Sequence, residues 1–162
     1  MLNGVRILDF TDHRGDVGPW LLGRLGADVI RVEDPDGSPT RRLEPMYEGT
    51  SLHFASYNDN KRSIVIDRSS PEDLQTLRQM VSTTEIIFES GPPGWLSDLG
   101  LDATEIERLN PTIVHVLVTA FGQDGPRATD PATELTIAAL GGPVRIQGTR
   151  ERAPLKISIP QV

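Results

Sequence analysis

Cysteine is absent from this chain of 162 residues, which excludes disulfide frameworks, thiolate nucleophiles and cysteine-ligated zinc sites. Aromatic residues are scarce, at 5% of the chain. Apolar runs are short, and none approaches the roughly 20 residues that a helix needs to span a bilayer. The first residues also lack the basic-then-apolar pattern of a signal peptide. Together these absences predict a cytoplasmic globular protein.

Basic residues are too few for general electrostatic binding to nucleic acid or anionic lipid. The chain has 16 lysines and arginines against 23 aspartates and glutamates, which gives a formal net charge of −7. Such a protein repels polyanions unless some of its cations are gathered locally. The composition therefore remains compatible with a local basic pocket for a phosphorylated ligand.

Short β-branched runs alternate with helical stretches along the chain. Strands are expected at residues 5–10, 28–33, 63–67, 85–89, 112–120 and 155–159. Helices are expected between them, over residues 16–25, 70–81, 102–109 and 133–140. This order predicts an α/β fold, with a Rossmann-like, mostly parallel sheet that has helices on both faces.

Three local expectations follow from the patterning. The strand at 112–120 is the most apolar, so we expect it to be buried on both faces as a central parallel strand. Asp16, Ser70 and Asp102 each stand where an N-cap is wanted, and Val17, Leu21, Leu22 and Leu25 follow Asp16 at helical spacing. Prolines and glycines interrupt the segment from Asp34 to Ser51, and so long a loop in a compact domain is usually functional or disordered.

Loops after the carboxyl ends of the strands hold the candidate binding residues, because ligands gather there in such folds. The first turn, residues 11–18 (TDHRGDVG), could hold a phosphate or carboxylate through backbone amides and Arg14. Comparable turns are residues 67–70 (DRSS), 91–94 (GPPG) and 121–127 (FGQDGPR). Taken one at a time, each is more simply explained as an ordinary turn.

Glu134 and the histidines are the remaining candidates for chemistry. Glu134 lies in the first turn of a predicted helix, where the helix dipole stabilises a carboxylate and where it could also act as a general acid or base. His13, His53 and His115 lack metal-ligand spacing, so no metal site is expected. Motif by motif, the sequence indicates only a ligand-binding α/β domain.

Taken in order, several segments are similar to a known family. They are residues 4–11 (GVRILDFT), 25–33 (LGADVIRVE), 60–67 (NKRSIVID), 93–101 (PGWLSDLGL), 109–114 (LNPTIV) and 121–126 (FGQDGP). Together they resemble the N-terminal region of the family III CoA-transferases, the CaiB/BaiF family, which includes formyl-CoA and carnitine CoA-transferases and α-methylacyl-CoA racemase. We therefore expect residues 1–162 to be the N-terminal, Rossmann-like, CoA-binding segment of the family's large domain, with the remainder of the protein absent.

The resemblance implies a transferase that moves CoA from an acyl-CoA to a small carboxylic acid. Family members use an aspartate that becomes an enzyme-bound aspartyl-CoA thioester, and they form interlocked homodimers. CoA or acyl-CoA then enters as substrate, with no permanently bound cofactor, nucleic acid or membrane partner expected. The family's nucleophilic aspartate would fall just beyond Val162, so the isolated chain is predicted to be inactive.

The resemblance also implies particular site residues. Nine positions match the family's CoA-contacting loops: Arg14, Gly15, Ile66, Asp67, Arg68, Ser69, Ser90, Gly91 and Pro92. Glu134 matches an acidic position of the family's active site, where it would act as a supporting acid.

Three departures from the family pattern bear on the chemistry. Two arginines that hold CoA phosphates in some members correspond to Asp34 and Asp98 here. Because acids repel phosphates, either the CoA pose differs or the phosphates rely on other cations, namely Arg14, Arg41, Arg42 or Arg68. Thr133 stands where the racemase pattern has a histidine, which weakens a racemase interpretation.

The alternative from a different class is a non-catalytic CoA-binding subunit that pairs with a catalytic relative. The residue after Val162 separates the two hypotheses: aspartate favours a transferase, whereas alanine or tyrosine favours the subunit.

Overall fold

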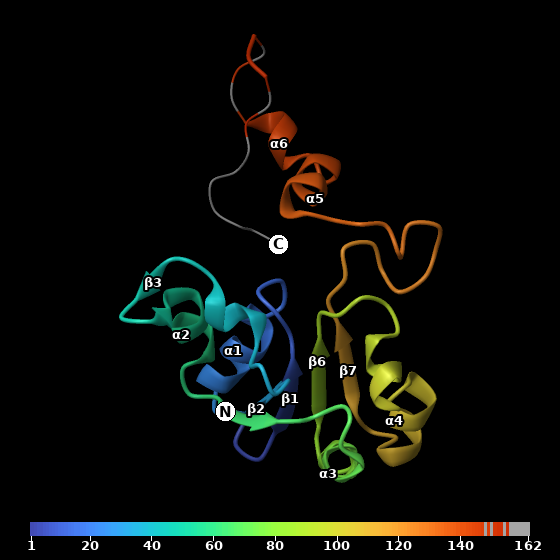
Figure 1. Ribbon diagram of the computed structural model, residues 1–162. Coiled ribbons are helices and arrows are strands. Elements are labelled where there is room, and N and C mark those ends of the chain that lie inside the picture. Colours follow the sequence, from blue (N-terminus) through green and yellow to red (C-terminus); the bar gives the residue numbers. More distant parts are fainter. Residues whose placement is uncertain (148, 150, 154, 156–162) are drawn as a thin grey trace. The chain divides into compact units, whose positions relative to one another are not determined.

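A five-stranded parallel sheet forms the centre of the computed structural model, which describes residues 1–147, 149, 151–153 and 155 (Figure 1). Its strands, in spatial order, are β5 (Arg62–Val65), β2 (Asp28–Glu33), β1 (Arg6–Phe10), β6 (Ile86–Glu89) and β7 (Val114–Leu117). Every neighbouring pair is parallel. The predicted Rossmann-like α/β fold is therefore confirmed.

Helices cover both faces of this sheet. On one face, α3 (Pro71–Val81) and α4 (Ala103–Leu109) contribute Leu77 and Ile106 to a core that includes Leu8 and Ile87 of the sheet. On the other face lies α1 (Val17–Arg24), next to a smaller cluster of buried residues: Ile7, Ala27, Val29 and Phe88.

Glycines bring α1 close to the sheet. A Cβ at Gly18 would lie 2.7 Å from Cε1 of Phe88, and one at Gly23 would lie 3.2 Å from Cγ2 of Val29. The buried residues of α1 are Pro19 and Gly23, whereas Val17 and Leu21 are half exposed. Of the four residues predicted at helical spacing, Leu22 packs against the smaller cluster, whereas Val17, Leu21 and Leu25 are exposed. Small residues rather than large ones form the closest contact with the sheet.

Of the three N-caps predicted for the helices that pack on the sheet, two form side-chain hydrogen bonds. Ser70 accepts a hydrogen bond from the backbone N–H of Asp73, and Asp102 accepts one from that of Glu105. Asp16 precedes α1, but its side chain makes no capping hydrogen bond. The carboxylate of Asp16 has long-range partners instead, which are described below.

The apolar strand β7 lies at the edge of the sheet in the part of the chain that the structure describes. Val114 is 55% exposed and Leu117 is 37% exposed. The expectation of a central strand buried on both faces is therefore wrong for these residues. Apolar composition identified a strand of a parallel sheet, but it does not distinguish the last position of the sheet from an inner one.

The segment predicted as a long loop contains short elements. A 3₁₀ turn, η1 (Pro39–Arg42), is followed by a hairpin of β3 (Met46–Tyr47) and β4 (Thr50–Ser51). Helix α2 (Leu52–Asn58) comes next and was not predicted. Its N-cap is Ser51, whose side chain accepts a hydrogen bond from the N–H of Phe54.

The chain divides into two compact units, residues 1–119 and 120–162. The second contains α5 (Glu134–Leu140) and α6 (Pro143–Ile146). Thr133 caps α5 in a reciprocal capping box with Thr136. The strand predicted at 155–159 falls outside the described residues. No described helix is long and apolar enough to cross a membrane.

The packing of α3 and α1 leads to opposite expectations for two leucines. Leu77 is fully buried in the larger core, so we expect Leu77→Ala to cost about 2–5 kcal/mol of unfolding free energy. Leu21 is half exposed, so Leu21→Ala should cost less than about 1 kcal/mol. Urea unfolding of the 162-residue chain measures both. Equal costs would contradict the described packing of α1.

Candidate functional site

The guanidinium of Arg31 in β2 lies at the centre of a buried polar cluster. Its Nη1 donates to Asp9 Oδ2 at 3.1 Å and to Asp16 Oδ1 at 2.7 Å. Its Nη2 donates to the Thr11 carbonyl at 2.6 Å and to Ser38 Oγ at 2.9 Å. Burial alone would lower the pKa of Arg31, but the charges of Asp9 and Asp16 raise it further than burial lowers it.

Lys61 and His53 complete this cluster. Lys61 Nζ donates to Asp9 Oδ2 at 2.8 Å, and its side chain is almost fully buried. His53 Nε2 lies 3.1 Å from Asp16 Oδ2. Two buried carboxylates thus face two buried cations, and the partial exposure of His53 places it at the margin.

Another buried carboxylate, that of Glu33 in β2, fixes the loop that follows the strand. Arg41 grips it with two hydrogen bonds of 2.6 and 2.7 Å, and Ser63 Oγ and the Ser38 N–H also donate to it. Burial raises the pKa of Glu33, but these donors outweigh it and lower the pKa from 4.5 to about 2. Glu33 is therefore held ionised in the folded protein at neutral pH.

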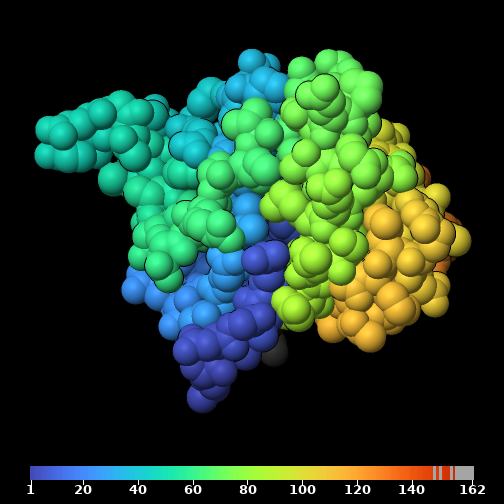
Figure 2. Space-filling model, turned by 90° about the horizontal axis from the view of Figure 1, so that it is seen from below, coloured from blue at the N-terminus to red at the C-terminus, as the bar shows by residue number. Residues whose placement is uncertain are grey.

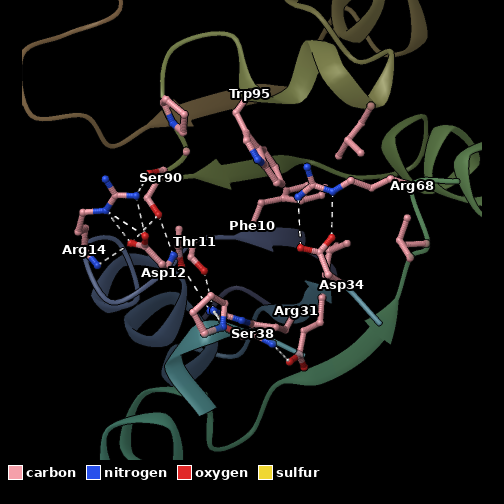
Figure 3. Close-up of a pocket in the computed structure, with 17 residues that line it drawn as sticks. Phe10, Thr11, Asp12, Arg14, Arg31, Asp34, Ser38, Arg68, Ser90 and Trp95 are labelled. Atoms are coloured by element: carbon pink, nitrogen blue, oxygen red, sulfur yellow. Dashed lines mark hydrogen bonds and ion pairs between the residues drawn. The ribbon is translucent and has the colours of Figure 1, made fainter. Parts of the chain in front are cut away.

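A cavity of about 230 Å³ opens beside the Arg31 cluster, at the carboxyl ends of β1, β2, β5 and β6. Side chains and backbone from all four strand ends line it (Figure 3). The lining includes Phe10, Asp12, Arg14, Arg31, Asp34, Ile66, Arg68, Ser90, Gly91, Pro92 and Trp95. This is the place where α/β folds bind ligands.

One end of the cavity is polar. Arg14 grips the carboxylate of Asp12 with hydrogen bonds of 2.9 and 2.6 Å and donates to the Ser90 carbonyl at 2.6 Å. Burial raises the pKa of Asp12, but the hydrogen bonds and charge of Arg14 lower it further than burial raises it. The hydrogen bond from Arg14 to Asp12 in turn raises the pKa of Arg14. Ser90 Oγ accepts from the Asp12 N–H at 2.7 Å, which joins the turns after β1 and β6.

The other end of the cavity is aromatic. Trp95, in the 3₁₀ turn η2 (Trp95–Leu99), meets Phe10 edge-on with ring centroids 5.9 Å apart. The Arg68 guanidinium lies over the Trp95 ring at 4.7 Å and pairs with Asp34, with Nε 2.9 Å from Oδ1. In Figure 3 these four side chains gather on one side, away from Arg14 and Asp12.

Gly91 allows the approach of the Trp95 ring. A Cβ at Gly91 would lie 2.7 Å from Cβ and from Cγ of Trp95. The turn after β6 therefore requires glycine for the aromatic end to form as it does. The GPPG turn, which the sequence alone explains as an ordinary turn, thus also makes room for the Trp95 side chain.

Six of the nine predicted CoA-contacting residues line the cavity. They are Arg14, Ile66, Arg68, Ser90, Gly91 and Pro92. The other three, Gly15, Asp67 and Ser69, are not among the lining residues. Asp67 instead accepts hydrogen bonds from the N–H and the hydroxyl of Ser69. That any of the nine contacts CoA stays a prediction.

Glu134 is the first residue of α5 and belongs to the second unit, residues 120–162. Its role as a supporting acid stays a prediction. Among the described residues, no group of three or more histidine, aspartate or glutamate side chains could hold a metal ion.

Several lining residues were not singled out by the sequence patterns. Phe10 is the last residue of β1, Asp12 lies two residues beyond it, and Trp95 follows the GPPG turn. Their common signal is position, because each lies at or after the carboxyl end of a strand. Aromatic residues at such strand ends would have pointed to a stacking surface.

Comparisons with known proteins agree with the fold. The family model described as CoA-transferase family III matches residues 2–162. A succinyl-CoA:(R)-benzylsuccinate CoA-transferase subunit of Thauera aromatica is 35% identical over 93% of this chain and 38% of its own length. A formyl-CoA:oxalate CoA-transferase of Afipia carboxidovorans is 36% identical over 95% of this chain and 37% of its own.

A solved CaiB/BaiF family protein from Brucella suis superposes with a TM-score of 0.88 and 31% identity, over 98% of this chain and 43% of that one. The chain thus spans about two fifths of the length of these relatives.

The Arg31 cluster leads to a stability prediction. Arg31→Met would leave two buried carboxylates with one fewer cation, so we expect a loss of about 3–5 kcal/mol of unfolding free energy. The matched control is Arg24→Met, which removes an exposed ion pair with Asp59 and should cost less than about 1 kcal/mol. Chemical denaturation at pH 7 compares the two variants. If Arg31→Met left the unfolding free energy unchanged, the cluster would not be what holds this part of the structure together.

Proposed function

Because the chain belongs to CoA-transferase family III, we propose that its protein moves CoA from an acyl-CoA to a small carboxylic acid. In this proposal the first unit supplies the surface that binds CoA. The resemblance further suggests a cytoplasmic, interlocked homodimer, which is part of the same proposal. CoA acts as a substrate that enters and leaves with each turnover.

The cavity at the strand ends is the observation that carries the proposal. Its aromatic end, Phe10 and Trp95, suits the adenine ring, since purines stack on aromatic faces. Its polar end offers Arg14 and the turn after β6 to the phosphates. A small cavity with one stacking surface and one polar edge, where Arg14 is paired with Asp12, suits the nucleotide portion of CoA, with the pantetheine arm extending beyond it.

The chemistry proposed is covalent catalysis by an aspartate carboxylate. The carboxylate attacks the thioester carbonyl of acyl-CoA and forms a mixed anhydride, and CoA leaves as a thiolate. The thiolate then attacks the aspartyl carbonyl of the anhydride, which releases the donor carboxylate and leaves an aspartyl-CoA thioester. The acceptor carboxylate repeats the two steps in reverse and departs as the new acyl-CoA. Each step replaces one acyl bond by another, so no external reductant or oxidant is needed.

The residues for this exchange are divided between the chain and its continuation. The nucleophilic aspartate is proposed at the position after Val162, and Glu134 is proposed as a supporting acid. The 162-residue chain would therefore bind CoA without transferring it.

A second candidate function is a CoA-binding subunit without catalysis of its own. One relative, the protein from Thauera aromatica, is named as a subunit of its transferase, which makes a heteromeric arrangement a concrete alternative. The residue encoded after Val162 separates the candidates, since only a carboxylate there can form the aspartyl thioester.

The two tryptophans allow a direct test of CoA binding. Trp95 lines the cavity, whereas Trp20 of α1 packs against Tyr57 and donates to Asp59. We expect CoA to quench the fluorescence of Trp20→Phe, which keeps Trp95, because the adenine ring stacks near it. The matched variant Trp95→Phe, which keeps Trp20, should show little quenching. Quenching confined to Trp20 would place the ligand elsewhere and contradict the proposed cavity.

Hydroxylamine tests the division of the active site. It captures acyl-anhydride and thioester intermediates as hydroxamates. Incubated with acyl-CoA, the isolated 162-residue chain should yield no aspartyl hydroxamate by mass spectrometry, because its nucleophile lies beyond its last residue. The full-length protein should yield one at the next position. A hydroxamate on the short chain would refute the assignment of the nucleophile.

A further inference from the structure

Three arginines line the cavity, and each is paired with at least one carboxylate. Asp12 pairs with Arg14, Asp34 pairs with Arg68, and Arg31 lies between two buried aspartates. Pairing cancels most of the charge that a ligand meets at a distance, so the cavity gathers anions only weakly by its field. Anion binding here depends instead on which guanidinium N–H groups are left to donate at contact.

Arg14 combines a fixed position with N–H groups that the protein leaves unused. Its Nε and Nη2 bond to the Asp12 carboxylate, at 2.9 Å from Oδ1 and 2.6 Å from Oδ2. Nη2 also donates to the Ser90 carbonyl at 2.6 Å. Nη1 makes no hydrogen bond or ion pair within the described part of the chain, and the side chain is 48% exposed. The two N–H groups of Nη1 are therefore available to a ligand.

The other two arginines of the lining lack this combination. Arg31 uses both of its terminal nitrogens on groups of the protein, and its side chain is buried. Arg68 also has an unused Nη1, but among the described residues Asp34 is its one hydrogen-bond partner, and the Asp34 side chain is 52% exposed. So exposed an ion pair holds a side chain weakly. Arg14 is thus the best-positioned donor of the cavity.

Asp12 can hold Arg14 because Asp12 is itself held. Its Oδ1 accepts the backbone N–H of Arg14 at 2.9 Å and the hydroxyl of Ser90 at 3.0 Å. Its own N–H donates to Ser90 Oγ at 2.7 Å, and Ser90 is buried. In Figure 3, dashed lines join the three residues at the polar end of the cavity. The Asp12 carboxylate is therefore fixed between the turns after β1 and β6, and it fixes the guanidinium in turn.

From this geometry we propose that Asp12 is a positioning residue, which with Ser90 orients Arg14 so that its Nη1 donates to an anionic oxygen of the ligand. That oxygen belongs to a phosphate of CoA or to the carboxylate of the acid substrate, since both offer a guanidinium the same acceptor. A donor held in place before binding loses less rotamer freedom when the ligand arrives. The inference rests on the proposed function, which supplies both groups, and it names a residue that prepares the contact without touching the ligand.

The sign of one substitution tests this role. Asp12→Asn removes a negative charge near the ligand, so charge alone predicts tighter binding of an anion. Positioning predicts the opposite, because Asn cannot grip the guanidinium with two carboxylate oxygens. We expect binding to weaken roughly two- to tenfold, the range for immobilising one long side chain. Titrations of the 162-residue chain, followed by amide NMR shifts, measure the affinities.

Three ligands identify the anion that Arg14 holds. CoA carries all the groups of the nucleotide, ADP carries a diphosphate without a carboxylate, and succinate carries carboxylates without a phosphate. Arg14→Gln should weaken ADP and CoA about tenfold if the anion is a phosphate, or succinate by a similar factor if it is a carboxylate. Either result supports the inference. Unchanged affinities for all three ligands would overturn it, provided that CoA binds the parent chain.

A double-mutant cycle separates positioning from a general structural effect. In the Arg14→Gln chain, Asp12→Asn should cause no further loss for the ligand that Arg14 holds, because its effect passes through Arg14. Ser90→Ala, which removes the hydroxyl that fixes Asp12, should weaken binding in the same direction as Asp12→Asn. It replaces Asp12→Asn if urea unfolding shows that the latter does not fold. The matched control, Asp36→Asn, removes a charge outside the lining and should not weaken binding.

Two further results would count against Asp12. Tighter binding after Asp12→Asn, or an equal loss with and without Arg14, would overturn its positioning role while CoA binding itself stands. No response of the parent chain to CoA would instead contradict the proposed function, and this inference with it.

Discussion

The hydrogen-bond network around the Arg31 guanidinium determines the geometry at the carboxyl ends of the strands. This one side chain joins β1 through Asp9, the start of α1 through Asp16, and the loop after β2 through Ser38. Lys61, just before β5, is tied to the same Asp9 carboxylate. Four segments therefore meet at one buried cluster, and the planar guanidinium orients the three segments that it contacts directly.

The cavity owes both its place and its electrostatics to this arrangement. Arg31 forms part of the lining, yet buried carboxylates balance its charge. It therefore helps to shape the cavity more than it attracts an anionic ligand. The remaining cations of the lining are likewise paired at the rim. Selectivity at such a site depends on which ion pairs a ligand can replace or must avoid, rather than on a general positive potential.

The sequence predicted those features that depend on local patterns. The five strands of the parallel sheet and the caps by Ser70 and Asp102 follow from short-range periodicity and helix-start signals. Asp16 shows the limit of such reasoning, because an aspartate before a helix satisfies the rule for a cap whether or not a distant arginine takes its oxygens. The inner face of α1 was predicted only in part, through Leu22, because glycines form the rest of it and glycines carry no hydrophobic signal.

Prediction of the site met a similar limit. Six of the nine CoA-contacting candidates came together because a resemblance had located the strand ends, whereas Phe10 and Trp95 become neighbours only in three dimensions. The pairing of Arg68 with Asp34 likewise joins residues on different strand ends, and no local pattern encodes it.

Buried ion clusters are costly to form, which bears on why this one is present. Removing several charges from water is repaid only by close geometry, and apolar residues of similar volume often give equal or greater stability. Net stability is therefore a weak explanation for the burial of Asp9 and Arg31 in the sheet and of Lys61 beside it. Positioning is the stronger one, because an apolar core would not fix the Thr11 carbonyl and the Ser38 hydroxyl at hydrogen-bond distances. A cluster that holds the turns after β1 and β2 in place preserves the outline of a ligand cavity against the variation that surface loops otherwise show.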